Sequence, residues 1–129
     1  AEADALGLER HASVRELVRS GLDAVSVHVA TPPGAPPALD KEGVAGLRRG
    51  AVVVNCAGAG AVDARALQSA LCSGALGGAA VDTPDGPDWL EAWVRELPNL
   101  VLTPRVAFYS DQAFDDQRAH ALELAAAFL

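Results

Sequence analysis

The sequence predicts an α/β domain built on a doubly wound parallel sheet, and two observations lead to that class. Short runs of β-branched and small apolar residues alternate along the chain with segments of helical periodicity. At least one helix-like segment lies between successive runs, as the crossovers of a parallel sheet require. We count four strands joined by right-handed connections. No linker, repeat or low-complexity tract divides the 129 residues, so we expect one domain or part of one.

Caps and stop residues set the element boundaries in the first half of the chain. A short helix over 13–20 has Val14, Leu17 and Val18 on one face and ends before Gly21. The next segments are a strand over 22–30 with alternating valines and a proline-rich loop over 31–38. A helix over 40–49, capped by Asp40 and ended by Gly50, leads to a strand over 51–55. The β-branched run of this last strand fits burial on both faces of the sheet.

The alternation continues in the second half. We expect a helix over 63–73, capped by Asp63 with Leu67 and Leu71 facing inward, and a strand of small residues over 77–81. A helix over 88–97, opened by Pro87 and ended by Pro98, carries an apolar stripe of Trp89, Leu90, Trp93 and Val94. A strand over 100–103 precedes a last helix over 110–129, capped by Ser110, with Phe114, Ala121, Leu122, Ala125 and Phe128 on one face.

Composition and charge exclude several function classes. Half of the residues are hydrophobic, but only 5% are aromatic, so the core must use small side chains. The net charge is −7 and Lys41 is the only lysine, which argues against direct binding of nucleic acid. No apolar run reaches about 18 residues, and AEADALGLER lacks the pattern of a secretory leader. Cys56 and Cys72 form no C-x-x-C pair, so we expect two buried free thiols, no metal site, and a cytoplasmic or nuclear protein.

The stretch AVVVNCAGAGAVD, residues 51–63, allows two interpretations. In a dinucleotide fingerprint G-x-G-x-x-G, Gly58 and Gly60 would take the first two positions, and Asp82 would lie near the offset of the ribose-binding acid. The third glycine position falls on Asp63, whose carboxylate would lie near the pyrophosphate. An ordinary strand-to-helix turn is therefore the favoured interpretation of these residues by themselves.

Other candidate residues also have a structural interpretation. We expect a structural role for His28 inside its strand, an exposed position for His120, and a polar turn around His11. No G-x-S-x-G elbow accompanies a serine nucleophile. Cys56 follows a strand near a helix N-terminus, where a thiol pKa can fall, but an inert thiol is favoured. Trp89 and Trp93, four residues apart on one helix, are expected to pack in the core rather than to anchor an interface.

The order of several segments resembles the cofactor-binding domain of the D-isomer-specific 2-hydroxyacid dehydrogenases. The stretches are RELVRSGLDAVSVHVA, LRRGAVVVNCAGAGAVDARALQSAL, SGALGGAAVD and PNLVLTPRVAFYS, from about Ala5 to the C-terminus. Within this family, GPDWLEAWVRELPN and the Pro-Arg of TPRVAFYS resemble the C-terminal-binding proteins and their plant ANGUSTIFOLIA branch. The resemblance implies the C-terminal part of a Rossmann-like NAD-binding domain, residues 1–129 forming a single partial domain, with its first mononucleotide half, phosphate turn and ribose acid lying upstream.

The resemblance also assigns the site, residue by residue. Active relatives use an arginine to hold the substrate carboxylate, a histidine as base and a glutamate to orient it, and these positions fall on Gly58, Arg105 and near Asp85. Glycine has no side chain to hold a carboxylate, and a guanidinium does not deprotonate in proteins. Asp85 is a short stand-in for the glutamate. At the cofactor, the resemblance implies Asp82, Cys56 and Ala57. Asp82 has an equally good interpretation as an ordinary strand-end cap.

We therefore expect a non-catalytic regulatory or scaffolding protein, with protein partners and, by resemblance, a homodimeric state. A full-length form is expected to sense NAD, whereas this chain alone is not expected to bind it. The alternative is an NAD-dependent oxidoreductase acting on the CH–OH group of a D-2-hydroxy acid through an altered triad. An incomplete gene model of either would give the same sequence. Without the upstream half, strand 22–30 has an open edge, so we expect the isolated chain to self-associate.

Overall fold

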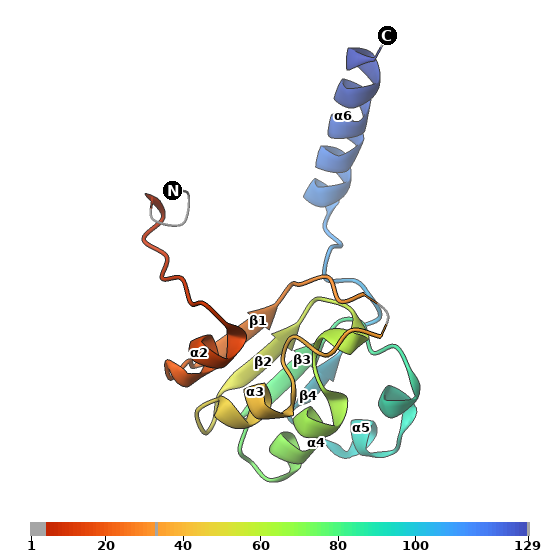
Figure 1. Cartoon of the computed structure of the whole chain (residues 1–129). Helices are drawn as coiled ribbons and strands as arrows, with labels where there is room; N and C mark the ends of the chain where they lie inside the picture. The colour runs from red at the N-terminus through yellow and green to blue at the C-terminus, as the bar shows by residue number, and fades with distance from the viewer. Residues whose placement is uncertain (1–4, 33, 129) are drawn as a thin grey trace.

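A four-stranded parallel sheet forms the centre of the molecule. The computed structural model describes residues 5–32 and 34–128. The strands are β1 (Ala24–Val27), β2 (Val52–Asn55), β3 (Gly78–Val81) and β4 (Leu100–Leu102). They lie side by side in the order β1-β2-β3-β4, and every neighbouring pair is parallel (Figure 1). The predicted α/β class, the four strands and their parallel pairing are confirmed.

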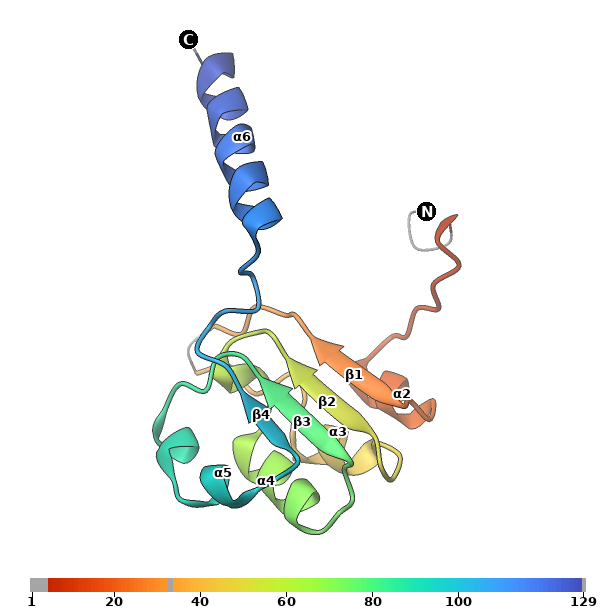
Figure 2. The same ribbon diagram turned by 180° about the vertical axis from the view of Figure 1, so that it is seen from behind.

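The helices that precede β1 and connect the strands pack against a single face of the sheet. They are α2 (Val14–Arg19), α3 (Lys41–Gly46), α4 (Ala64–Cys72), the 3₁₀ turns η1 (Ala59–Ala61) and η2 (Pro87–Leu90), and α5 (Trp93–Glu96). Figures 1 and 2, which view the sheet from opposite sides, show α2, α3, α4 and α5 on the same side of the strands. Right-handed crossovers that always step in one direction require this arrangement. The described chain is thus a parallel, Rossmann-like α/β sheet with these helices on one face.

Side-chain alternation along the strands separates a buried face from an open one. Val27, Val53 and Val81 are at most 7% exposed and point toward the helices. The neighbouring positions form a row across the other face, Ser26 to Val54 to Ala80 to Val101, by strand register. Val101 in that row is 59% exposed. The core consists of valine, alanine and leucine with two tryptophans, as the composition predicts.

Three predicted helix caps are confirmed. The side chains of Asp40, Asp63 and Ser110 each accept a hydrogen bond from the backbone amide three residues further on, at 2.7, 2.9 and 3.0 Å. Each bond satisfies an amide that has no partner within its own helix. Helix boundaries set by such residues differ from the predicted ones by only one to three residues.

The predicted continuous helix over 88–97 is wrong. The segment divides into η2 and α5 because Glu91 has an extended backbone, with φ −72° and ψ 158°. The break coincides with an ion-pair cluster, in which the Arg65 guanidinium of α4 binds both Asp88 and Glu91. Leu90, predicted to face the core, is instead 82% exposed. The break lets both carboxylates reach Arg65.

Trp89 and Trp93 nevertheless pack as predicted. They are 5% and 8% exposed and belong to the core cluster, and their ring centroids lie 5.7 Å apart at a tilt of 48°. Such tilted contacts are favourable aromatic geometries. The prediction that these two side chains pack in the core, rather than anchor an exposed interface, is therefore confirmed.

The last helix, α6 (Asp111–Ala127), projects away from the sheet and its helices (Figures 1 and 2). None of its residues is buried, and Leu122 and Phe128 are 72% and 90% exposed. The helix itself is confirmed, but its apolar face does not pack on the core of this chain, and Leu129 lies outside the described residues. Among the residues described, no helix combines the length and apolarity that crossing a membrane demands.

Two smaller expectations also need correction. The strand predicted over 22–30 is only four residues long, and His28 lies just beyond its end. The cysteines are not buried, since Cys56 is partly exposed and Cys72 is exposed. Cys72 is the last residue of α4, whose buried side chains are Leu67 and Leu71. Cys56 follows β2 at the open carboxyl end of the sheet.

The close approach of two loops at Gly77 provides a test of the packing. A Cβ at Gly77 would lie 2.5 Å from the carbonyl oxygen of Gly50, whereas a Cβ at Gly58 would have no atom within 4 Å. We expect Gly77→Ala to lower the free energy of unfolding by about 1–3 kcal/mol through steric overlap. Gly58→Ala, the matched control, should leave it unchanged or raise it slightly. Urea denaturation measures both, and equal stabilities would contradict the packing at Gly77.

Candidate functional site

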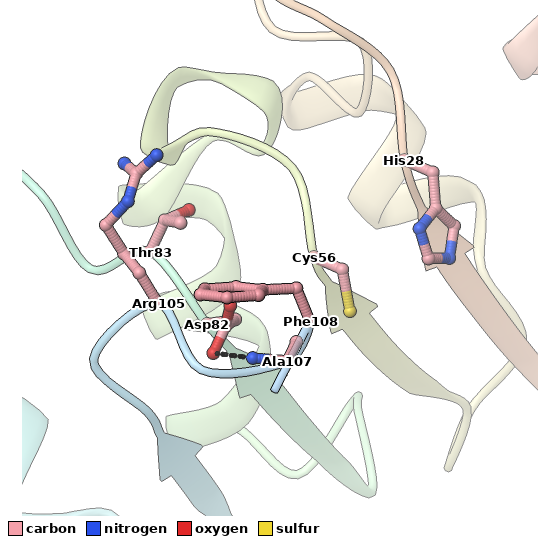
Figure 3. Close-up of a pocket in the computed structure, with 7 residues that line it drawn as sticks. All are labelled: His28, Cys56, Asp82, Thr83, Arg105, Ala107 and Phe108. Carbon is pink, nitrogen blue, oxygen red and sulfur yellow. Dashed lines mark hydrogen bonds between the residues drawn. The ribbon is translucent and has the colours of Figure 1, made fainter. Parts of the chain in front are cut away.

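A pocket opens at the carboxyl ends of the strands, the edge at which parallel α/β sheets bind their ligands. It has a volume of about 380 Å³. The residues that line it are His28, Cys56, Asp82, Thr83, Arg105, Ala107 and Phe108. Figure 3 shows the Cys56 thiol between His28 and the Phe108 ring, and the ring lies beside Asp82. Residues far apart in sequence thus meet because each follows the end of a strand or the loop after β4.

Asp82, the residue after β3, holds the loop that follows β4. Its Oδ1 accepts from the Thr103 hydroxyl at 2.6 Å and from the amides of Val106 and Ala107 at 2.8 and 3.0 Å. Its backbone carbonyl also accepts from the Arg105 amide at 2.6 Å. Among the described residues no hydrogen bond uses Oδ2. One oxygen therefore fixes the loop, and the other remains available to the pocket.

These hydrogen bonds keep the Asp82 carboxylate ionised. The pKa of Asp82 lies below its ordinary value of 3.8, chiefly because the Thr103 hydroxyl donates to the charged form. The two loop amides and the nearby Arg105 charge lower this pKa further, while burial opposes them. The side chain is only 7% exposed. The pocket therefore has a fixed negative charge at its base near neutral pH.

Arg105 forms an ion pair with Asp85 at the rim of the pocket. One guanidinium nitrogen donates to Asp85 Oδ2 at 3.0 Å, and both side chains are exposed. The Arg105 backbone has φ 57°, a left-handed conformation that is uncommon outside glycine. The Asp82 contacts on both sides of this residue hold that conformation. The two predicted positions, one for the base and one for its orienting acid, are thus brought together as a cation and an anion.

The turn after β2 is organised by a buried asparagine. Asn55 is fully buried, its Oδ1 accepts from the Ala57 amide at 3.0 Å, and its Nδ2 donates to the Gly58 carbonyl at 3.3 Å. The Thr83 hydroxyl donates to the Ala57 carbonyl. Ala57 therefore contacts the pocket through Thr83, whereas Gly58 is not among the lining residues. The Thr83 hydroxyl therefore connects the end of β3 to the turn that follows β2.

The geometry of this turn resolves the two interpretations of AGAGAVD. A fingerprint helix begins directly after its strand, but here β2 ends at Asn55 and α4 begins at Ala64, with η1 between them. Gly58 has φ −66°, and neither Gly58 nor Gly60 adopts a positive φ. Asp63 caps α4 with its own carboxylate. The stretch is an ordinary strand-to-helix connection, as the residues favour.

The remaining candidates are distributed around the molecule. His28 lines the pocket, is exposed, and has its Nε2 2.6 Å from the Ser26 hydroxyl. His120 is exposed on α6, as expected, and His11 lies near Glu9 and Glu16 in a polar turn. Within the residues that the structure covers, no three His, Cys, Asp or Glu side chains gather in a way that could hold a metal ion.

Sequence reasoning missed three residues that shape the pocket. The Thr103 hydroxyl donates a hydrogen bond to the Asp82 carboxylate, and the Thr83 hydroxyl links the end of β3 to the turn after β2. Phe108 forms a wall of the pocket. Thr103 and Phe108 both lie inside the quoted stretch PNLVLTPRVAFYS, so the segment was identified but not these roles. The only local signal for the two threonines is a hydroxyl residue directly after a strand, and this signal does not identify the residue on another strand that the hydroxyl contacts.

The Asp82 contacts predict a specific pH dependence. Because the folded-state pKa lies below the unfolded value, the carboxylate stabilises the folded protein above about pH 4, and this contribution is lost as the pH falls toward the lower folded-state pKa. We expect Asp82→Asn to have a lower free energy of unfolding than the wild type at neutral pH. The difference between the two free energies should become smaller below about pH 4. Asp85→Asn, which removes an exposed carboxylate, is the control and should change the free energy of unfolding only slightly at neutral pH. Urea titrations at several pH values measure this, and a pH-independent difference at Asp82 would contradict it.

Comparison with known proteins agrees with the sheet and with the segments that line the pocket. The family model for the D-isomer specific 2-hydroxyacid dehydrogenase NAD binding domain matches residues 1–107. C-terminal binding protein AN of Arabidopsis thaliana is 33% identical over 106 residues, 82% of this chain and 17% of that protein. Glycerate dehydrogenase of Methylorubrum extorquens is 34% identical over 104 residues, 76% of this chain and 32% of that protein.

Solved structures share the fold. D-lactate dehydrogenase from Aquifex aeolicus, solved with NAD and lactic acid, superimposes with a TM-score of 0.76 over 99% of this chain and 43% of its own, at 22% identity. The chain spans less than a third of the length of the two curated relatives it matches. The match to the family model nonetheless covers most of the chain, including every strand and all the residues that line the pocket except Phe108. The chain therefore belongs to the D-isomer specific 2-hydroxyacid dehydrogenase family, through that family's NAD binding domain.

Proposed function

We propose that this chain is part of an NAD-binding domain that has lost dehydrogenase chemistry and serves a regulatory or scaffolding role. The observation that carries the proposal is the ion pair between Arg105 and Asp85. The resemblance places Arg105 where active relatives have a histidine base, and Asp85 near the position of the glutamate that orients it. Oxidation of a 2-hydroxy acid requires a group that takes the hydroxyl proton as hydride leaves. A guanidinium remains protonated and cannot take that proton.

The second requirement, a cation for the substrate carboxylate, is also unmet. The position of the family arginine is Gly58, where the space around a Cβ is empty and no side chain reaches the pocket. A bidentate arginine contact is the usual means of holding a carboxylate. Arg105 does not replace it, because its guanidinium is bound to Asp85. Two of the groups that the reaction needs are thus absent together.

The described residues fit only the nicotinamide end of NAD. Asp82 Oδ2 can accept a hydrogen bond from an amide N–H, and Phe108 presents an aromatic wall for a flat ring. The stretch 56–63 does not form a phosphate turn, and the pocket has one cation, which is already paired. When bound, NAD supplies a hydride acceptor or donor. In this chain the residues would orient its ring but provide no base beside it.

The alternative is an NAD-dependent oxidoreductase on a D-2-hydroxy acid with a rearranged site. One observation favours it, because His28 lines the same pocket as Asp82. An imidazole can serve as the base near neutral pH. Its Nε2, however, is within hydrogen-bond distance of the Ser26 hydroxyl. Among the described residues that line the pocket, the arginine, Arg105, is bound to Asp85. The non-catalytic role is therefore better supported.

A role through protein partners follows from the similarity to C-terminal binding protein AN. We infer partners that are proteins, a homodimeric assembly in a longer form, corepression or cell-shape regulation, and a cytoplasmic or nuclear location. Phe108, Tyr109 and Phe114 form an aromatic cluster with centroids 5.1–6.4 Å apart. Phe108 and Tyr109 are each 64% exposed, which supports contact with another protein surface.

The first test is turnover. We expect no NAD- or NADP-dependent absorbance change with small 2-hydroxy or 2-oxo acids above the level of Gly58→Trp and His28→Gln variants. In glycerate dehydrogenase of Methylorubrum extorquens, exchanging the residues aligned with Gly58 and Arg105 for glycine and arginine should lower kcat about 10²–10⁴-fold. Turnover by this chain that His28→Gln abolishes would establish the alternative instead.

The second test is cofactor binding. Without a phosphate turn, we expect this chain to lack micromolar affinity for NAD, because backbone amides at a helix N-terminus hold the diphosphate in such domains. Isothermal calorimetry with NAD, and with nicotinamide mononucleotide as the shorter probe, measures the affinity directly. Saturable micromolar binding that Asp82→Ala removes would show that these residues hold the cofactor unaided.

A further inference from the structure

A buried carboxylate oxygen faces the pocket at the carboxyl ends of the strands. Asp82 is 7% exposed, and the side-chain hydrogen bonds that it accepts, from Thr103, Val106 and Ala107, all use Oδ1. No described residue donates to Oδ2, and Asp82 lines the pocket. A buried anion is costly unless opposite charge or hydrogen-bond donors compensate it. The pocket therefore has an unmet interaction, which a ligand with a positive charge satisfies.

The cations of this region do not compensate that oxygen. Arg105 also lines the pocket, but its guanidinium donates to Asp85 at 3.0 Å. In Figure 3 the Arg105 side chain extends away from the Asp82 carboxylate. Gly58, to which the resemblance gives the position of the carboxylate-binding arginine, has no side chain, and the space around a Cβ there is empty. The pocket thus has the opposite charge to one that holds a substrate carboxylate.

The walls of the pocket suit a single flat ring. Phe108 lines it and is 64% exposed, so its ring is accessible to a ligand. A cation near the face of an aromatic ring is attracted by the ring electrons. The volume of about 380 Å³ lies at the lower end of the range for ligand pockets. Charge, aromatic wall and size therefore favour one class of small molecule.

We propose that this pocket selects flat, positively charged nitrogen heterocycles, of which a pyridinium ring is the simplest, and rejects carboxylates. The oxidised nicotinamide ring belongs to this class, so the inference rests on the fit to the nicotinamide end of NAD in the proposed function. Phe108 contacts the ring, and Asp82 Oδ2 faces its charge. A unit charge ~5 Å from a carboxylate near a protein surface changes affinity about tenfold, after part of the attraction is offset by desolvation.

Titration of the full 129-residue chain with three small probes, followed by NMR of the backbone amides, measures this selectivity. The probes are 1-methylnicotinamide, a cation; 3-methylbenzamide, a neutral ring of the same shape; and 3-methylbenzoate, an anion. We expect 1-methylnicotinamide to bind with a dissociation constant on the order of 1–10 mM, as befits so small a ligand. It should bind about tenfold more tightly than 3-methylbenzamide and shift the amides of Val106 and Ala107.

Equal affinities for the cation and the neutral ring, tighter binding of the anion, or amide shifts confined to residues away from the pocket would overturn the inference. The turnover assay of the proposed function does not depend on any of these results, so the two can fail separately. The 1-methylpyridinium ion, which lacks the carboxamide, distinguishes two sources of the ligand. Equal binding of this ion indicates any pyridinium, whereas weaker binding indicates the nicotinamide end of a dinucleotide.

Substitution of Asp82 tests its role directly. Asp82→Asn keeps an acceptor oxygen for the loop that follows β4 but replaces Oδ2 with an amide nitrogen. It should reduce the preference for the cation over the neutral ring to less than about twofold. Asp23→Asn makes the same charge change at the amino-terminal end of β1, and His28→Gln removes the imidazole that lines the pocket. Both controls should keep the preference, and a preference that persists in folded Asp82→Asn would overturn the proposal.

The thiol of Cys56 provides a measurement that requires no change at Asp82. It lines the pocket, and in a Cys72→Ser chain it is the only thiol. Methanethiosulfonate reagents that carry either a trimethylammonium or a sulfonate group report the local charge through their relative rates. We expect the ratio of cationic to anionic rates at Cys56 to be about tenfold higher than at Cys72 in a Cys56→Ser chain. Equal ratios at the two thiols would contradict a cation-selective pocket.

Discussion

A single topological constraint determines most of this structure: right-handed crossovers that always step the same way across a parallel sheet. Each step from β1 to β4 returns over the same face, so all the helices between strands cover that face and the other remains open. The same constraint collects the carboxyl ends of the strands at one edge. The pocket and the one-sided cover of helices over the described sheet are therefore consequences of one rule rather than independent features.

Asp82 connects the end of β3 to the loop that follows β4. A single carboxylate oxygen binds a hydroxyl and two amides, and this fixes the Arg105 backbone in a left-handed conformation. The Arg105 backbone is thus held in place, while its side chain is paired with Asp85. In the function that we propose, the geometry around Asp82 is kept although the base is exchanged for an arginine.

The sequence was sufficient for features that depend on local patterns. Valine runs predicted the strands, and Asp40, Asp63 and Ser110 predicted helix starts, because a cap acts within three residues of itself. Features that depend on distant partners were missed. The break at Glu91 accompanies an ion pair to Arg65, and the contact between Thr103 and Asp82 joins residues 21 apart. The exposure of α6 was also missed, since an apolar helical face does not reveal what covers it.

In the function that we propose, an arginine at position 105 in place of the family's histidine has a physical consequence for any ligand in the pocket. A histidine can lose its proton and so alternate between neutral and charged forms during a reaction, whereas a guanidinium does not deprotonate in proteins. The Arg105–Asp85 ion pair lies at the rim of the pocket, and the Asp82 carboxylate lies at its base. Arg105 can therefore distinguish ligands by charge and shape but cannot exchange a proton with them. Among the described residues that line the pocket, His28 is the one imidazole, and its Nε2 lies 2.6 Å from the Ser26 hydroxyl. On this proposal, recognition in which the bound state itself is the signal suits the pocket better than turnover.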